Sequence, residues 1–211
     1  MNIHIEGNIG AGKSTLLNFI EKNFDCNISQ EPVDEWMNLR DGNENILDKF
    51  YKDIDRWSFA FQMNCFISRT HQVKQLPRNQ VNFIERSIYS DRIFAVNCYN
   101  SGKMNKIEFD IYERWSKWLA SELCDKIDAI IYLRSTPEVS AERIKERSRK
   151  SEEKIPLEYL KKLHRLHDEW LLDNRDIPVL ILDADKINYN SKKVINDISA
   201  TFKLYPCSNS Y

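Results

Sequence analysis

The sequence lacks an excess of charge of either sign. Its 211 residues include 31 Lys and Arg against 32 Asp and Glu, which gives a formal net charge of -1. A nucleic-acid polymer or an anionic membrane surface usually binds a strongly basic protein, so the composition predicts neither as a partner. Any phosphate binding must therefore depend on a local group of residues.

The sequence also lacks a cysteine framework and a long apolar run. Its five cysteines are odd in number and contain no CxxC pair, so neither a disulfide scaffold nor a zinc site is predicted. No apolar run approaches the roughly 18 residues that a membrane helix requires. Residues 2–6 already have a strand pattern and leave no room for a targeting peptide, so we expect a cytoplasmic protein.

Short apolar runs alternate with charged helical patterns along the chain. The apolar runs lie at 2–6, 26–30, 81–85, 129–133 and 179–183. The helical patterns lie at 13–24, 54–75, 107–124, 137–149, 157–173 and 191–203. This alternation predicts a single α/β domain over residues 1–211, a three-layer doubly wound fold with five parallel strands. Its ligands should bind beyond the carboxyl ends of the strands.

A glycine-rich segment follows the first predicted strand. Its residues are Gly7, Asn8, Ile9, Gly10, Ala11, Gly12, Lys13 and Ser14, which match GxxxxGK[ST], and Thr15 comes next. Glycine lets the backbone curl around phosphate groups with its N–H groups pointing inward. Lys13 would neutralise the β and γ phosphates of ATP, the Ser14 hydroxyl would ligate Mg²⁺, and Thr15 offers the next hydroxyl. The motif predicts nucleotide binding, but several classes of ATPase, GTPase and kinase share it.

Charged residues stand at the ends of the second and third predicted strands. Glu31 is placed to act as a general base on a hydroxyl acceptor, although a structural turn acid fits its position equally well. Glu85 could hold the hydrated Mg²⁺ and Arg86 could bind the reacting group, or the two could form an ordinary ion pair.

Five segments, in this order, resemble a known family. They are IEGNIGAGKST at 5–15, EPVDEW at 31–36, RWSFAFQ at 56–62, ERSIYSDR at 85–92 and EEKIPLEYLKKLHRLHDEWL at 152–171. Over nearly its whole length the chain resembles the deoxyribonucleoside kinases, which include deoxycytidine kinase, deoxyguanosine kinase and mitochondrial thymidine kinase. The resemblance implies transfer of the γ-phosphoryl group of ATP to the 5′-hydroxyl of a deoxyribonucleoside, with Mg²⁺ as cofactor, by a homodimer.

The resemblance also implies catalytic roles. Glu31 would be the general base on the 5′-hydroxyl, Arg86 would lie near that hydroxyl and the transferred phosphoryl group, and Glu85 would lie at the metal. A lid at about 143–155 would close over the ATP phosphates with Arg143, Arg147 and Arg149, whereas their helical spacing alone is typical of a solvated face. Ser148 stands where the deoxycytidine branch commonly has glycine.

Other matching residues would form the nucleoside pocket. Tyr51 and Glu152 would hold the sugar 3′-hydroxyl, and Gln62 would bind the edge of the base. Trp36 and Phe61 would form apolar walls, a role that the resemblance alone supports, because buried aromatic residues at such spacings usually belong to the core.

The identity of the base rests on Arg69 and Asp91. Arg69 lies two helical turns after Gln62 and shares its face of the helix, and Asp91 ends the segment ERSIYSD. Arg69 and Asp91 could therefore meet over the base. The deoxycytidine and deoxyguanosine branches resemble this chain at both places, whereas residues 37–53 and 101–104 are more similar to the thymidine branch. We give the pair more weight, because an unpaired polar group in a pocket costs about 1–3 kcal/mol. The expected base is cytosine or a purine.

A broad-specificity or thymidine-preferring deoxynucleoside kinase is the first alternative function. Two further functions and the role of one apolar surface also stay open. A nucleoside monophosphate kinase would need a cationic pocket where this chain has Glu31. A regulatory or scaffold protein that binds a nucleotide without turnover is disfavoured by the intact set of Lys13, Ser14, Glu31, Glu85 and Arg86. Trp115, Trp118 and Leu119 could form the apolar face of the homodimer or belong to the core.

Overall fold

A five-stranded sheet runs through the middle of the computed structural model, which describes residues 1–122, 126–149, 151–152, 155–173 and 176–207. All its pairings are parallel, in the order β2-β5-β1-β6-β7. The strands are β1 (Asn2–Glu6), β2 (Asn27–Ser29), β5 (Asn82–Glu85), β6 (Ala129–Arg134) and β7 (Val179–Asp183). The predicted α/β fold with five parallel strands is confirmed.

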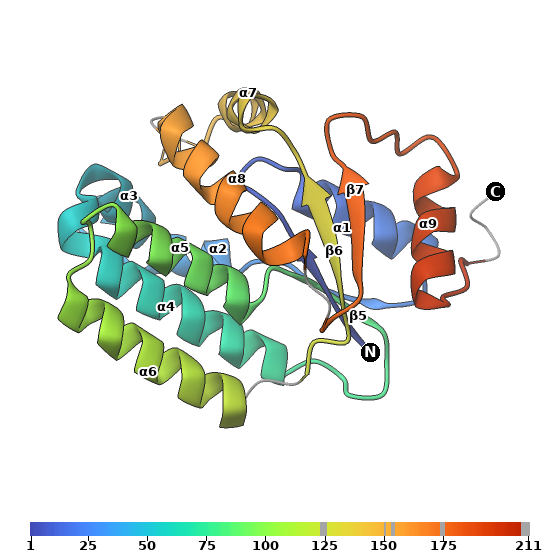
Figure 1. Cartoon of the computed structure of the whole chain (residues 1–211), viewed down its shortest axis with the longest axis horizontal. Coiled ribbons are helices and arrows are strands. Elements are labelled where there is room, and N and C mark those ends of the chain that lie inside the picture. The colour runs from blue at the N-terminus through green and yellow to red at the C-terminus, as the bar shows by residue number, and fades with distance from the viewer. Residues whose placement is uncertain (123–125, 150, 153–154, 174–175, 208–211) are drawn as a thin grey trace.

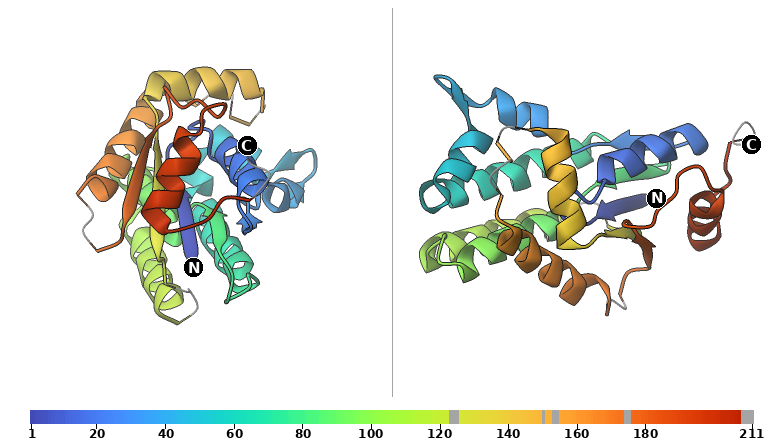
Figure 2. Two further views of the ribbon diagram at one scale, coloured as in Figure 1. Left: turned by 90° about the vertical axis from the view of Figure 1, so that its right-hand side faces the viewer. Right: turned by 90° about the horizontal axis from the view of Figure 1, so that it is seen from above.

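Helices cover both faces of the sheet, as Figures 1 and 2 show. One face carries α1 (Lys13–Asn23) and α9 (Lys193–Phe202). The other face carries α4 (Ile54–Lys74), α5 (Ile88–Asn100), α6 (Lys106–Glu122) and α8 (Leu157–Leu171), and α7 (Pro137–Arg147) crosses beyond the tips of β6 and β7. This is the predicted three-layer arrangement.

The central strands are buried on both faces, which explains their apolar sequences. Ile3 and Ile5 of β1 have no exposed surface and pack in one core with Leu16 and Leu17 of α1. Residues 129–133 of β6 are buried without interruption, as is typical of a parallel sheet between two helical layers. The strict alternation of a half-exposed strand is therefore absent from β6.

Several short helices and strands were not predicted from the sequence. They are α2 (Val33–Asn38), β3 (Arg40–Asp41), β4 (Glu44–Asn45) and α3 (Ile46–Lys52), together with the longer α5. Helix α5 contacts α4, α6 and α8, so its buried residues do not form one apolar stripe. Helix α7 ends at Arg147, two residues before the predicted end, because Ser148 adopts a left-handed conformation with φ of 53°.

The structure describes four of the five cysteines, Cys26, Cys65, Cys98 and Cys207, and all four are free thiols; Cys124 lies outside the described residues. In the described part of the chain, no helix combines the length and the apolar character needed to cross a membrane. The cytoplasmic location stays a prediction.

Candidate active site

The fold brings three separate motifs together at the carboxyl ends of neighbouring strands. Strand β1 leads into the glycine-rich segment, β2 is followed by Glu31, and β5 ends at Glu85 and is followed by Arg86. Because β5 lies between β2 and β1, these residues meet at one edge of the sheet. This is where a doubly wound fold binds its ligands.

The glycine-rich segment has the backbone that its sequence requires. Gly7, Gly10 and Gly12 have φ values of 151°, 77° and 95°, which residues with side chains rarely adopt. A Cβ on Gly7 would lie 2.5 Å from the Leu133 carbonyl oxygen on β6. The Lys13 ammonium donates a hydrogen bond to the Asn8 carbonyl (3.0 Å) at the start of α1. The segment thus has the backbone geometry of an anion site at a helix N-terminus.

Hard oxygen donors lie beside this segment. The Ser14 hydroxyl donates to a carboxylate oxygen of Glu85 (3.1 Å), and the Lys13 ammonium lies 3.9 Å from the other oxygen. Among the described residues, no group of three His, Cys, Asp or Glu side chains could hold a metal ion. The Ser14 and Glu85 oxygens fit Mg²⁺ only if other oxygens, such as those of a nucleotide, complete its coordination.

Glu31 is held by two buried guanidinium groups. Its Oε1 atom accepts a hydrogen bond from Arg69 (2.8 Å) and lies 3.3 Å from Nε of Arg86. Burial would raise the pKa of Glu31, but the positive charges of Arg86, Arg69 and Lys13 outweigh it and lower the pKa to about 2. Glu31 is therefore ionised at neutral pH.

A pocket beside Glu31 gathers most of the residues expected to bind a nucleoside. Its lining includes Glu31, Trp36, Tyr51, Phe61, Gln62, Arg86, Asp91 and Glu152. The sequence analysis missed other lining residues, among them Ile9, Phe50, Phe94 and Tyr159. The Phe61 ring stacks on Phe50 with centroids 4.6 Å apart and meets Trp36 edge to face. The indole N–H of Trp36 donates to the Ser68 hydroxyl (2.9 Å), which fixes this wall against α4.

Arg69 and Asp91 form a bidentate ion pair. Nε of Arg69 donates to one carboxylate oxygen (2.8 Å) and Nη2 to the other (3.1 Å). The third nitrogen of Arg69 donates to the Glu85 carbonyl (2.9 Å). Asp91 lines the pocket, whereas Arg69 is absent from its described lining. Arg69 therefore lies behind Asp91. Burial raises the pKa of Asp91, and the charge and hydrogen bonds of Arg69 oppose that increase.

The expected lid arginines have different partners. Arg143 donates to the carbonyl oxygens of Ala11 (3.2 Å) and Ala184 (2.8 Å) and so ties α7 to the glycine-rich segment. Arg147 and Arg149 both pair with the carboxylate of Glu152, Arg149 at 2.7 Å. Lys150, Glu153 and Lys154 of the expected lid lie outside the described residues.

A second pocket lies over the glycine-rich segment and joins the first. Residues 10–15 line it with Arg143 and Arg147, and it shares Gly10, Lys13, Glu85 and Arg147 with the pocket beside Glu31. The sequence analysis missed Ile187 and Tyr189 in its wall; both follow the carboxyl end of β7, which was the available signal. Two pockets that meet at Lys13 and Glu85 define the class as a P-loop phosphotransferase with an aromatic pocket beside its glycine-rich segment.

Comparison with known proteins identifies the family within that class. The family model for deoxynucleoside kinase matches residues 3–203. The chain is 41% identical to a probable deoxycytidine kinase of fowlpox virus, covering 87% of this chain and 78% of that protein. It is 40% identical to deoxycytidine kinase of Mus musculus (87% and 84%) and 37% identical to mitochondrial thymidine kinase 2 of Homo sapiens (87% and 70%). The chain belongs to the deoxynucleoside kinase family and is an ATP-dependent kinase.

The close approach at Gly7 generates a test of the nucleotide site. We expect Gly7→Ala to weaken ATP binding at least about tenfold, because the added methyl group would displace the segment from β6. Gly42→Ala is the matched control: Gly42 also has a positive φ, but nothing lies within 4 Å of its Cβ position. Calorimetric titration with ATP measures both variants. Equal affinities would show that this packing does not shape the nucleotide site.

Proposed function

We propose that this kinase transfers the γ-phosphoryl group of ATP to the 5′-hydroxyl of a deoxyribonucleoside. The observation that carries the proposal is the environment of Glu31. Its Oε1 atom is fixed by Arg69 and Arg86, whereas its Oε2 atom accepts no hydrogen bond from a described residue. Glu31 lines the acceptor pocket together with Lys13 and Glu85. A free carboxylate oxygen at that point suits a hydroxyl acceptor, which must lose a proton.

The low pKa of Glu31 fits a late proton transfer. A carboxylate with a pKa of about 2 is a weak base in the ground state. In a loose phosphoryl-transfer transition state, the hydroxyl becomes acidic only as its oxygen bonds to phosphorus. Glu31 would orient the hydroxyl and take its proton at that stage, while Arg86 and Lys13 stabilise the charge on the phosphoryl oxygens.

A Mg²⁺ ion bound with ATP would be held by the Ser14 hydroxyl and the Glu85 carboxylate, the two groups already in contact. The ion supplies charge neutralisation at the phosphates. The backbone N–H groups of residues 7–15 would bind the phosphates, and Arg143, Arg147 and Arg149 would close over them.

The sugar would be held by Tyr51 and Glu152, which both line the acceptor pocket. Burial raises the pKa of Tyr51 well above its usual value, so its phenol stays protonated and can donate a hydrogen bond. The Glu152 carboxylate can accept one from a 3′-hydroxyl even while Arg147 and Arg149 remain bound, because each oxygen has a second lone pair.

The nucleobase of the substrate would carry an exocyclic amino group. Both oxygens of Asp91 accept hydrogen bonds from Arg69, so Asp91 presents acceptor lone pairs to the pocket, and these favour the amino group of cytosine or a purine over the carbonyl of thymine. Gln62 would bind the neighbouring edge of the base, with Trp36 and Phe61 against its faces.

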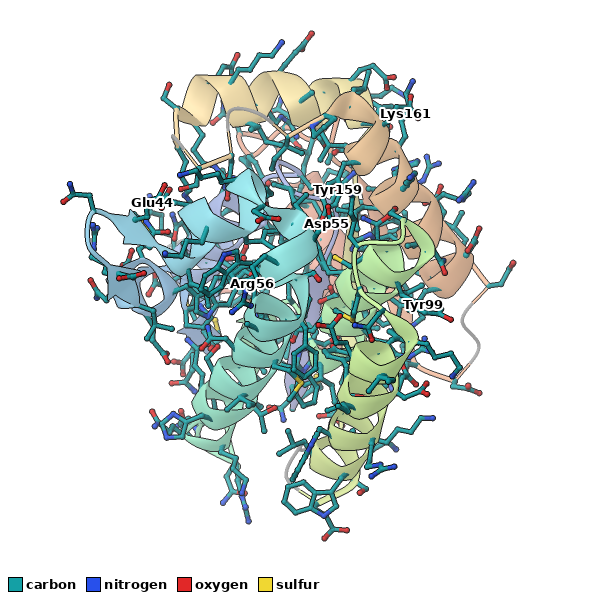
Figure 3. The ribbon with its side chains drawn as sticks, turned by 90° about the vertical axis from the view of Figure 1, so that its left-hand side faces the viewer. Glu44, Asp55, Arg56, Tyr99, Tyr159 and Lys161 are labelled. Carbon is teal, nitrogen blue, oxygen red and sulfur yellow. The ribbon has the colours of Figure 1, made fainter. Side chains whose placement is uncertain are left out.

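A homodimer is the proposed assembly, as the family resemblance implies. Five large apolar side chains of α4 and α6 are 39–73% exposed: Ile67, Ile107, Ile111, Trp115 and Trp118. The two helices run side by side in Figures 1 and 3, and Leu119 of α6 is buried in the core instead. An apolar stripe of this kind suits a protein–protein interface.

Replacing Glu31 tests the proton transfer. Glu31→Gln should lower kcat about a hundredfold or more, while ATP binding stays near normal, because the amide keeps the shape but cannot take a proton. Steady-state kinetics with deoxycytidine and a separate ATP titration distinguish the two effects. Near-normal turnover would remove Glu31 from the mechanism.

Replacing the Arg69–Asp91 pair tests the choice of base. The double change Arg69→Met with Asp91→Ala should move the ranking of kcat/KM over the four deoxynucleosides toward thymidine, since it removes the acceptor for an amino group. The unsubstituted protein should prefer deoxycytidine or a purine deoxynucleoside. A thymidine preference before substitution, or an unchanged ranking afterwards, would contradict the assignment.

Light scattering on a sizing column tests the dimer. We expect twice the chain mass of 25.1 kDa, and a shift to one chain mass for Trp115→Glu with Trp118→Glu. Tyr205→Glu, which changes an aromatic residue that is 91% exposed and lies outside these helices, should leave the mass unchanged. A dimer that survives both tryptophan changes must use another surface.

A further inference from the structure

Glu6 is a fully buried carboxylate to which the proposed reaction assigns no role. It ends β1, directly before Gly7, and none of its surface is exposed. Neither of its carboxylate oxygens accepts a hydrogen bond from a described residue. Burying a carboxylate costs free energy unless its surroundings compensate the charge. The polar and charged groups that face Glu6 therefore indicate the role of its carboxylate.

Glu6 faces the start of α5. Side chains alternate along a strand, and Ile3 and Ile5 point into the core beneath α1, so Glu6 points to the opposite face. Ser87 and Ser90 cap α5, and the Ser90 hydroxyl donates to the Ser87 carbonyl (2.8 Å). The Ser87 hydroxyl accepts from the Tyr89 N–H (3.2 Å), so its own hydrogen can point toward Glu6, whose pKa it lowers. That hydrogen is available to the Glu6 carboxylate.

The strand that ends in Glu6 also fixes Arg86. Arg86 has a φ of 62°, a left-handed conformation that costs a residue with a side chain about 1 kcal/mol or more. The Ile5 carbonyl accepts from its backbone N–H (2.9 Å), and the Gly7 carbonyl accepts from its guanidinium (3.0 Å). Burial lowers the pKa of His4 to about 4, so this imidazole is neutral, and its Nδ1–H donates to the Arg86 carbonyl (2.9 Å). Three of the four residues from His4 to Gly7 thus contact Arg86 directly.

We propose that Glu6 is a positioning residue for phosphoryl transfer: its carboxylate, through the Ser87 hydroxyl and the positive charge of Arg86, keeps the Arg86 guanidinium beside Glu31. The proposal rests on the function proposed above, because Arg86 matters for turnover only if it contacts the transferred group. Glu85 is in register with Ile5, so its side chain lies on the α1 face of the sheet, opposite to Glu6. Glu6 therefore acts on the arginine rather than on the proposed metal ligands.

The charge of Glu6 depends on pH near neutrality. Burial raises the pKa of Glu6 to about 7, although the Ser87 and Ser90 hydroxyls and the positive charges of Arg86 and Arg69 oppose it. The neighbouring groups on other elements are the Lys13 ammonium of α1, the Tyr132 phenol opposite Glu6 on β6, and the His167 imidazole of α8, which is stacked on Tyr132. Burial lowers the pKa of His167 to about 3, so the imidazole is neutral.

The sign of the effect on stability follows from the raised pKa. The folded protein retains the Glu6 proton up to about pH 7, whereas the unfolded chain loses it near pH 4.5. Stability from Glu6 is therefore full below about pH 4.5 and falls as the pH rises through 7. If ionised Glu6 positions Arg86, kcat must change in the opposite direction and rise through the same range.

Glu6→Gln tests the proposal in the full chain. We expect kcat at pH 8 to fall about tenfold, with KM for deoxycytidine within about twofold, and the rise of kcat near pH 7 to disappear. The urea midpoint should no longer fall between pH 5 and 8. Glu6→Asp, which keeps the charge, should recover part of kcat and the pH step. Glu113→Gln, the same change at a half-buried residue of α6 outside the site, should alter neither.

Wild-type kcat in Glu6→Gln, or a lower kcat with the pH step retained, would overturn the positioning role. If the Glu6→Gln variant does not fold, the Ser87→Ala variant tests the positioning role instead. It removes a hydroxyl that lowers the pKa of Glu6, so the step in kcat should move to higher pH, and an unmoved step would contradict the proposal. If the unsubstituted protein phosphorylates no deoxynucleoside, the proposed function fails instead, independently of Glu6.

Discussion

One carboxylate oxygen, Oε1 of Glu31, lies between two buried guanidinium groups, and the organisation of the site depends on that contact. Arg69 brings charge from α4 and Arg86 brings it from the end of β5. A buried arginine needs paired anions, and Arg69 finds them in Glu31 and Asp91. The same pairing therefore aligns the proposed general base, the proposed acceptor for the nucleobase and the end of β5. Loss of any one partner would leave charge uncompensated in the interior.

Backbone geometry supplies a second constraint beside these charges. The glycine-rich segment passes so close to β6 that Gly7 has no room for a side chain, and Arg86 adopts a left-handed conformation that hydrogen bonds from β1 enforce. Both features place rigid groups around the point where the two pockets meet. Phosphoryl transfer depends mainly on positioning and electrostatic stabilisation, so a site held by strands and buried ion pairs suits this chemistry.

Much of this arrangement could be predicted from the sequence. The five apolar runs gave all five strands of the parallel sheet, and the motif spacing placed Lys13, Glu31, Glu85 and Arg86 at adjoining strand ends. Helix α5 was missed because it is surrounded by other helices and has no single apolar stripe. Phe94 was missed because it lies on α5 and only tertiary packing brings it to the pocket. Tyr189 could have been found, because it follows the carboxyl end of β7. The position of Arg69 behind Asp91 depends on side-chain geometry that helical periodicity does not specify.

The central claim is that a γ-phosphoryl group passes from ATP to a nucleoside hydroxyl. Mass spectrometry of the products formed from deoxycytidine, or from its 5′-monophosphate, with γ-¹⁸O-labelled ATP tests it directly. Labelled deoxycytidine 5′-monophosphate should form from the nucleoside, and no diphosphate should form from the monophosphate. Labelled inorganic phosphate without a nucleotide product, or phosphorylation of the monophosphate alone, would contradict the central claim.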